Sequence, residues 1–302
     1  MPERPSFRPS EEEAPTIHES LRDPEKLPEG LIEIEKVYDL RRQYKDQVAL
    51  FERVGILKDG CITGIDGKEY PVPTLEGIAA RIEKKRDVLD GKHDQGLDQL
   101  LLVPIGMSLD VLMDTFKKFL LIYKQVHPDF GLDADRPLYT WETGYQGADR
   151  GEHPKLVYDI VSFGEEHGGK SKMKLLEDQG QNPDSTPGWR VMLVQKASQI
   201  SVMNRTPEEH LSTLQAAKNN PDSPDYGESG MTPEGWMIDF MANLEETGRP
   251  LDVAACLVGS YFVDSHYIPM ARWNKDSQLV LLDAIDPQSK DQDVGGYFAT
   301  EV

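Results

Sequence analysis

The chain has 302 residues, of which 38% are hydrophobic and 28% are charged, and its formal net charge at pH 7 is −20. This length is enough for one large domain or two ordinary ones with a substantial apolar core. Such an acidic surface repels phosphate backbones and anionic lipids, which argues against nucleic acid and membranes as partners. The charge does not identify a partner, because a high-salt habitat or an acidic proteome gives the same balance.

Cysteine usage and hydropathy indicate the compartment. Two cysteines, Cys61 and Cys256, are too few for a disulfide framework or a cysteine-rich zinc module. We expect two buried thiols, although a single disulfide between them stays open. Residues 1–20 lack the apolar segment of a secretory signal, and no apolar stretch is long enough to span a bilayer. We therefore expect a soluble, cytoplasmic protein.

The first part of the chain divides into an arm and a helical region. Residues 1–28 are rich in proline and poor in large apolar side chains, so we expect a disordered arm. Residues 29–130 are predicted to be mainly helical, with a small hairpin at Asp66-Gly67. The helices are expected at Leu31–Leu57, after the cap residue Thr74, and from Leu109 to about Gln125 after the cap residue Ser108.

Residues 131–302 differ in composition from the region before them, because aromatic and glycine-rich segments alternate with short apolar runs. We expect a mixed, loop-rich domain here. Strands are predicted at Leu138–Tyr145, Lys155–Phe163 and Gly188–Gln195, and helices at Thr206–Lys218 and Thr232–Gly248. The predicted fold class is therefore α+β, with a helical N-terminal region followed by a loop-rich mixed C-terminal domain.

One segment has the spacing of a phosphate-binding loop. Gly164–Ser171 matches the pattern Gly, any four residues, Gly-Lys-Ser, and an apolar run further on ends at Asp283. In a magnesium-dependent NTPase, the loop from Gly169 through Lys170 would bind phosphate, while Ser171 and Asp283 would hold the metal.

Two features of the same segment argue against this function. Glu165 and Glu166 would place negative charge where a phosphate needs positive potential. The helix after Ser171 is also predicted to be short. We favour an exposed glycine-rich loop and keep the P-loop-like NTPase as the alternative function.

Other chemical patterns are weak. The seven histidines show no paired metal-ligand spacing, and the aspartates between Asp283 and Asp293 follow no EF-hand order. Ser260 lacks the second glycine of a nucleophile elbow, and Cys256 lies in an apolar run typical of a packed thiol. We therefore predict no catalytic residue, no metal site and no cofactor.

An aromatic-rich segment near the C-terminus suggests a binding face. Tyr267, Arg272, Trp273 and Asn274 combine aromatic and hydrogen-bonding side chains, as surfaces that bind sugars or proteins do. The competing interpretation is that Trp273 anchors the core. The predicted function is non-enzymatic recognition of a protein, a small molecule or a glycan by the C-terminal domain, with these four residues as the ligand-binding set.

The C-terminal part of the chain carries several short motifs that are found together elsewhere. They are His167–Lys172, Gly188–Gln195, Met231–Trp236, Leu244–Gly248, Leu257–Tyr261 and Ile268–Asn274. On these motifs the region from residue 138 to 302 resembles an uncharacterised protein family of uncultured candidate-phyla bacteria. The resemblance implies that the His-Gly-Gly-Lys segment belongs to that family's own pattern, and it implies no activity.

The end of the chain has a second resemblance. Its layout from Arg272–Asn274 through Asp286–Pro287 to Gly296–Phe298 is similar to the close of C-type-lectin-like modules of the sulfatase-modifying-factor type. Those modules end in a Gly-Phe-Arg strand, whereas this chain has no arginine there. The resemblance implies a compact, loop-rich α+β scaffold with a variable binding face. The copper site of those enzymes is not carried over, because the chain has no matching cysteine pair.

Overall fold

The computed structural model describes residues 29–196, 204–251 and 254–302, so the arm predicted for residues 1–28 lies outside the described part. The described helices are α1 Glu29–Tyr38, α2 Leu40–Val54, α3 Leu75–Lys84, α4 Arg86–Asp94, α5 Leu109–Val126, α6 Glu142–Tyr145, α7 Lys172–Gln181, α8 Pro207–Ala217 and α9 Pro233–Thr247. The described strands are β1 Cys61–Thr63, β2 Glu69–Pro71, β3 Leu97–Val103, β4 Leu138–Thr140, β5 Leu156–Tyr158, β6 Arg190–Gln195, β7 Glu228–Gly230, β8 Ala254–Cys256, β9 Ser260–Phe262, β10 Ile268–Asn274, β11 Leu279–Ile285, β12 Val294–Gly296 and β13 Phe298–Glu301. These elements confirm the predicted α+β class.

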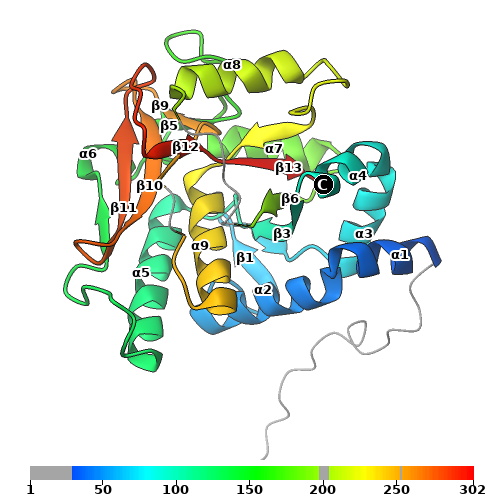
Figure 1. Cartoon of the computed structure of the whole chain (residues 1–302), viewed down its shortest axis with the longest axis horizontal. Coiled ribbons are helices and arrows are strands. Elements are labelled where there is room, and N and C mark those ends of the chain that lie inside the picture. The colour runs from blue at the N-terminus through cyan, green and yellow to red at the C-terminus, as the bar shows by residue number, and fades with distance from the viewer. Residues whose placement is uncertain (1–28, 197–203, 252–253) are drawn as a thin grey trace, which may run out of the picture.

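Two larger sheets organise the molecule (Figure 1). One sheet has four strands in the order β3-β6-β13-β7, all antiparallel. The other has five strands in the order β12-β8-β10-β11-β4, in which β12 pairs with β8 and β4 pairs with β11 in parallel. Two-stranded ribbons, β1–β2 and β5–β9, complete the described sheets, and β1–β2 is the hairpin predicted at Asp66-Gly67. None of the described helices is long and apolar enough to cross a membrane.

Helix α9 lies between the two sheets and contacts both β3 and β10 (Figure 1). Every residue from Pro233 to Met241 is buried, because α9 is covered on all sides rather than along one stripe. Thr232 caps its first turn by accepting a hydrogen bond from the Gly235 backbone amide. The start of this helix agrees with the prediction of a helix from Thr232 to Gly248.

The helix predicted for Leu31–Leu57 is interrupted. Asp39 adopts a left-handed conformation with φ of 50°, so the segment forms α1 and α2 instead of one rod. Aspartate tolerates this conformation better than most residues, which is why a periodic sequence can break there without glycine or proline. Gly55 ends α2, as predicted, with φ of 82°.

The two regions predicted at 29–130 and 131–302 share one sheet and one core. Strand β3 belongs to the first region, yet all of its pairing is with β6 from the second. The sequence analysis did not predict β3. Leu100 to Val103 are fully buried, and a strand buried on both faces gives a continuous apolar run without the alternation that identifies a half-buried strand.

Two glutamines of α2 cover the open edge of β3. Gln47 donates to the Leu100 carbonyl at 2.7 Å and accepts from the Leu102 amide at 2.9 Å. Gln43, one turn earlier, donates to the Asp98 carbonyl at 3.1 Å and accepts from the Leu100 amide at 2.7 Å. Each side-chain amide thus takes the place of a neighbouring strand, which removes a free edge that could pair with another chain.

We predict that Gln47→Ala lowers the free energy of unfolding by about 2–4 kcal/mol, because it leaves a strand donor and acceptor without partners in a buried place. Urea denaturation measures the loss. The matched control is Gln125→Ala, on an exposed face of α5, which should change stability by less than about 0.5 kcal/mol. Equal stability of the two variants would contradict this role of Gln47.

A buried ammonium group joins four segments beneath α9. The Nζ atom of Lys172, at the start of α7, lies 2.7 Å from Asp149 Oδ2 and 2.8 Å from Glu234 Oε1, and all three side chains are 0% exposed. Its third proton goes to the Met107 carbonyl at 2.7 Å. Tyr158 of β5 donates to the same Glu234 oxygen at 2.7 Å.

The same cluster fixes the start of α5. Asp149 Oδ2 accepts a hydrogen bond from the Leu109 amide at 2.6 Å, whereas the predicted cap residue Ser108 makes no capping hydrogen bond. Burial alone would lower the pKa of Lys172, but Glu234 and Asp149 raise it above its ordinary value. The lysine therefore carries its charge inside the protein, held by two carboxylates.

Lys172→Met is expected to cost about 3–5 kcal/mol of stability, because it leaves two carboxylates buried without a cation. Lys174→Met is the control, since Lys174 lies on the same helix, is 49% exposed and pairs only with surface carboxylates. Chemical denaturation of both variants distinguishes the two positions. If Lys172→Met were as stable as Lys174→Met, the cluster would not be holding these segments together.

Candidate functional site

The four residues predicted as a binding face do not form one patch. Tyr267 is 39% exposed just before β10, with its ring 5.7 Å from that of Trp141. Trp273, near the other end of β10, stacks on Phe130 at 5.4 Å and packs against the main core. Arg272 precedes Trp273 in the strand, so the two side chains point to opposite faces of the sheet. Asn274 accepts a hydrogen bond from the Ser277 amide and holds the following turn.

The segment with P-loop spacing is folded in a different way. The Gly169 amide donates to the side chain of His167, and the backbone of Lys170 forms an antiparallel bridge with Tyr158. Lys170 Nζ lies 2.6 Å from Asp178 Oδ2, on the helix that follows. Ser171 caps that helix, since its hydroxyl accepts from the Lys174 amide. These groups therefore bind one another where a P-loop would present them to phosphate.

The fourth residue of the alternative nucleotide site lies in the five-stranded sheet. Asp283 is on β11, and its carboxylate accepts from the Ala284 amide. The strand before the loop, β5, pairs only with β9 in an antiparallel ribbon among the described strands. A P-loop follows a strand of a parallel sheet, so the surroundings of Lys170 give the NTPase alternative no support.

The cysteines and Ser260 show no nucleophilic geometry. Both cysteines are free, and Cys61 is partly exposed, contrary to the expectation that both are buried. Burial raises the pKa of the Cys256 thiol to about 12, so this sulfur stays protonated. Ser260 is buried, with its hydroxyl 3.4 Å from the Leu257 carbonyl. Within the described residues, no group of three or more His, Cys, Asp or Glu side chains is placed to hold a metal ion.

A cavity of about 200 Å³ lies beneath α8, and we call it the His210 cavity. It is lined by residues of α8, of the loop before β7, of the β12–β13 junction and of the paired ends of β3 and β6; Figure 1 shows where these elements lie in the fold. Its lining residues are Gln95, Leu97, Gln195, Arg205, His210, Thr213, Leu214, Pro224, Asp225, Glu228, Gly296, Tyr297 and Phe298. Polar and apolar groups converge here from segments far apart in the chain, as they do in ligand sites.

His210 lies on the buried face of α8, and its side chain is 1% exposed. Its ring packs at 5.4 Å from Phe298, and a Cβ atom at Gly296 would come within 2.8 Å of the imidazole. Only glycine at this position lets the ring lie so close to β12. The Nε2 atom has no hydrogen-bond partner among the described residues. Burial and the charge of Arg205 lower the pKa of His210 to about 4, so the ring is neutral near pH 7.

A buried ion pair forms one wall of the His210 cavity. Lys92 Nζ lies 2.6 Å from Glu228 Oε1, and their side chains are only 4% and 9% exposed. Lys92 also donates to the Pro224 carbonyl and, at 3.3 Å, to Gln95 Oε1. All three protons of the Lys92 ammonium group thus have acceptors in residues that line the cavity. One oxygen of Glu228 remains outside this pair.

Arg205 lies at the mouth of the His210 cavity and is exposed. The neighbouring surface depression, lined by Thr206, Glu208, Glu209, Ser212, Asp225 and Gln288 among others, also includes it. The described part of the chain offers its guanidinium no ion-pair partner within 4 Å. An exposed arginine without an ion-pair partner beside a cavity is able to bind the carboxylate of a ligand.

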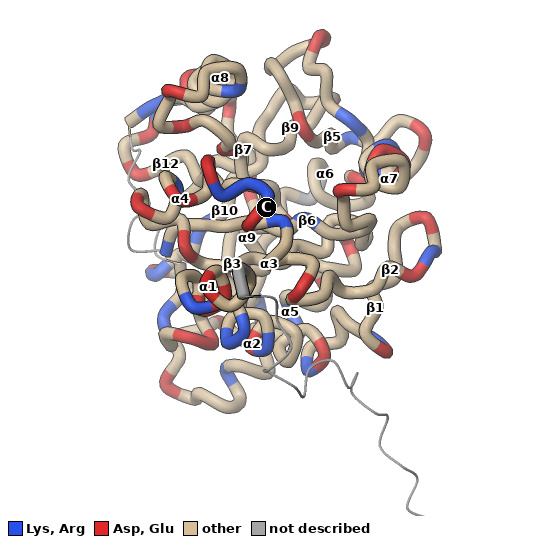
Figure 2. Tube along the Cα trace, turned by 90° about the vertical axis from the view of Figure 1, so that its right-hand side faces the viewer, with Lys and Arg blue, Asp and Glu red and all other residues tan. Residues whose placement is uncertain are grey.

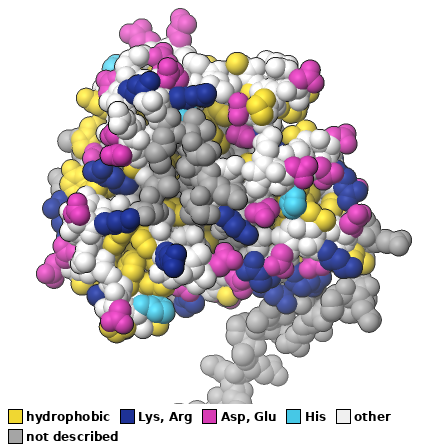
Figure 3. All heavy atoms as spheres, in the orientation of Figure 1, with side chains coloured by type: hydrophobic (Ala, Val, Ile, Leu, Met, Phe, Trp, Pro, Cys, Tyr) yellow, Lys and Arg dark blue, Asp and Glu magenta, His cyan; other side chains and the backbone are white. Residues whose placement is uncertain are grey.

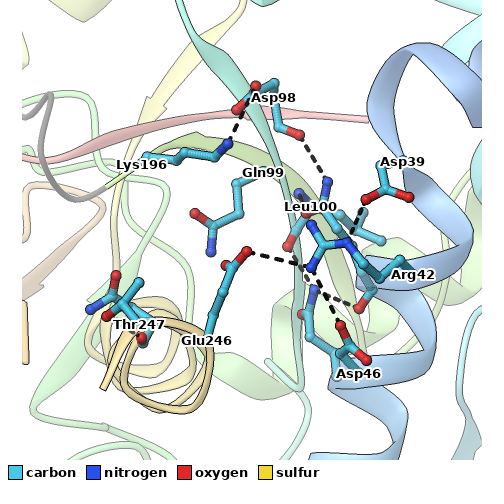
Figure 4. Close-up of polar contacts among 12 residues, drawn as sticks. Asp39, Arg42, Asp46, Asp98, Gln99, Leu100, Lys196, Glu246 and Thr247 are labelled. Atoms are coloured by element: carbon cyan, nitrogen blue, oxygen red, sulfur yellow. Dashed lines mark hydrogen bonds and ion pairs between the residues drawn. The ribbon is translucent and has the colours of Figure 1, made fainter. Parts of the chain in front are cut away.

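A second hollow, of about 360 Å³, lies between α2 and α9 over the edge of β3. Figure 4 shows Arg42 of α2 pointing toward Glu246 of α9, at 3.4 Å, with Gln99 of β3 nearby. A second ion pair across the hollow joins Arg53 to Glu245 at 2.7 Å. Both arginines of this hollow are therefore already paired with carboxylates of the described chain, unlike Arg205 of the His210 cavity.

A buried polar chain connects the two hollows. Gln99, in the wall of the α2–α9 hollow, donates to Asp239 Oδ1 at 3.4 Å, and Asp239 Oδ2 accepts from the Tyr297 hydroxyl. Tyr297 in turn lines the His210 cavity. Burial raises the pKa of Asp239 to about 7, against the opposing effect of the Tyr297 hydrogen bond. Asp239 is therefore an acid that changes its charge near neutral pH.

We predict that Asp239 makes folding pH-dependent. Its pKa is higher in the folded chain than in the unfolded chain, so its contribution to stability is present below pH 4 and is lost as the pH rises to about 7. Asp239→Asn keeps the shape and removes the titration. The unfolding free energy of the variant minus that of the parent should rise between pH 4 and 7, by on the order of 4 kcal/mol. Urea denaturation at several pH values measures it, and a difference independent of pH would contradict the prediction.

Comparisons with protein-family models, with curated proteins and with solved structures found no match in any of the three. Both resemblances noted from the motifs therefore stay predictions. Sequence analysis missed His210 and Arg205 because each is a single residue outside any motif. A signal for His210 was present, since Pro207, His210, Leu211, Leu214 and Ala217 follow helical spacing and mark one buried face.

Proposed function

We propose that this protein is a non-enzymatic binding protein that holds a small polar ligand in the His210 cavity. The observation that carries the proposal is His210 itself: of the seven buried side-chain atoms without a partner in the described residues, its Nε2 is the one whose residue lines this cavity. Buried polar atoms without partners are uncommon in proteins, and a missing ligand is one reason for them. Most of the lining comes from residues 131–302, the part predicted to carry the recognition function.

The protonation states favour binding over catalysis. With a pKa of about 4, His210 is a weak base near pH 7 and is not matched to proton transfer at that pH. The buried Cys256 thiol has a pKa of about 12 and is a poor nucleophile. A neutral imidazole that stays neutral is suited to a fixed hydrogen bond with a ligand.

The proposal predicts a ligand-dependent melting shift. A panel of small polar metabolites, with ATP and GTP plus magnesium included, is screened by thermal denaturation. A ligand at a hundred times its dissociation constant should add about 2.7 kcal/mol of stability. Arg205→Ala should reduce the shift at equal ligand concentration, because it removes the cation at the mouth of the cavity.

Arg249→Ala is the control for that variant, since Arg249 is also exposed but lines neither hollow. A shift that persists unchanged in Arg205→Ala would place the ligand elsewhere and contradict the proposed site. A shift with nucleotides alone that depends on magnesium and on Lys170 would favour the NTPase alternative instead.

A further inference from the structure

We infer that the ligand of the His210 cavity is a small zwitterion of the α-amino-acid type, with its carboxylate at Arg205 and its ammonium group at Asp225 and Glu228. This inference rests on the function proposed above and names the chemical class of the ligand. It follows from the distribution of charge and apolar surface around the cavity.

The cationic end of the site is Arg205. Its guanidinium presents several N–H donors in a plane, which matches the two oxygens of a carboxylate. It has no ion-pair partner within 4 Å in residues 29–196, 204–251 and 254–302, and it is exposed where a ligand would enter. In a chain with net charge −20, an arginine left without a carboxylate at a cavity mouth is available to one from a ligand.

The anionic end is formed by Asp225 and Glu228. Lys92 neutralises one charge of this pair through Glu228 Oε1, so one negative charge remains in the wall. Asp225 has no ion-pair partner of its own among the described residues. Burial raises the pKa of Glu228 against the opposing effect of Lys92, and the Asp225 carboxylate acts in the same direction as burial but to a smaller extent. A ligand ammonium group would relieve the repulsion between these two carboxylates.

The sum of these charges selects a zwitterion over a simple ion. Arg205 contributes one positive charge, and Asp225, Glu228 and Lys92 together contribute one negative charge. A simple anion would meet the carboxylates, and a simple cation would meet the guanidinium. A molecule with both charges pairs each with its opposite, and it also carries no net charge into an acidic protein.

The remaining walls of the cavity limit the rest of the molecule. Leu97, Leu214 and Phe298 give an apolar side, and Gln195 gives an amide that can donate or accept. A volume of about 200 Å³ is below the range of roughly 300–1,000 Å³ typical for drug-sized ligands. The site therefore fits a single amino acid with an apolar side chain of modest size better than a peptide or a nucleotide.

The test uses the full chain and the twenty standard L-amino acids, screened first by melting shift and then by calorimetry. For an apolar binder such as L-leucine, the two probes are 4-methylpentanoate, which lacks the ammonium group, and 3-methylbutylamine, which lacks the carboxylate. We expect each probe to bind at least tenfold more weakly than the amino acid. Equal binding of either probe would overturn the inference.

Two variants divide the site into its halves. Arg205→Ala should weaken the amino acid at least tenfold without weakening the amine, which loses a repelling cation. Asp225→Asn should weaken the amino acid without weakening the carboxylate probe, which loses a repelling anion. Arg249→Ala and Asp222→Asn are the controls, because both are exposed and neither lines the cavity. If both site variants bind L-leucine as the controls do, the ligand lies elsewhere and the inference fails.

The outcomes also distinguish this inference from the function on which it rests. If no amino acid binds but another polar molecule gives a shift that depends on Arg205, the zwitterion is wrong and the proposed binding function stands. If no member of either panel binds through Arg205, both proposals fail.

Discussion

The fold depends on the placement of one buried ammonium group. Lys172 lies between Asp149 and Glu234 with no exposure, and its three protons all reach acceptors. Removing two carboxylates and a cation from water is costly, and here the cost is offset by the two ion pairs and by hydrogen bonds to Asp149 Oδ2 and Glu234 Oε1, while Asp149 Oδ1 and Glu234 Oε2 have no partner among the described residues. The cluster therefore admits one arrangement of α5, α7, α9 and β5, because any displacement would leave a charge uncompensated inside the protein.

The position of the candidate site follows from this arrangement. Glu234 stands in the first turn of α9, and Asp239 lies little more than one turn further along the same buried helix. Asp239 contacts Tyr297, which precedes β13 and lines the His210 cavity. Fixing α9 by the cluster thus helps to position Tyr297, one of the residues that line the cavity. The charges that hold the fold and those proposed to hold a ligand lie in separate groups, so the proposed site can be altered without removing the cluster.

Features of the fold that depend on neighbouring residues could be predicted from the sequence, whereas features that depend on distant residues could not. The cap at Thr74, the helix starts at Thr206 and Thr232, the hairpin and the helix from Leu109 were predicted correctly, because each follows from neighbouring residues. Capping of α5 by Asp149 could not be predicted, since it joins positions forty residues apart. The pairing of Gln43 and Gln47 with the edge of β3 was missed for the same reason, because the groups they bind lie more than fifty residues away. Strand β3 itself was missed because both of its faces are buried, so its sequence does not alternate. The cavity was missed because five separate segments build it.

Two lysines of the glycine-rich segment, Lys170 and Lys172, lie in different surroundings although they are only two residues apart. The spacing draws attention to Lys170, which in the structure only pairs with Asp178 on the next helix. Lys172, two residues later, lies outside the P-loop pattern, yet it is the one buried among carboxylates. The difference arises at Ser171, whose cap starts α7 and turns the chain between the two lysines, so that one side chain points out and the other points in. A sequence motif describes only the spacing of residues along the chain. The contacts of each lysine depend on whether the local backbone directs its side chain toward the solvent or into the protein. The same reasoning applies to Arg205 and Arg272: neither has an ion-pair partner within 4 Å among the described residues, but Arg205 is exposed and lines the His210 cavity, whereas Arg272 Nε is buried without a hydrogen-bond partner.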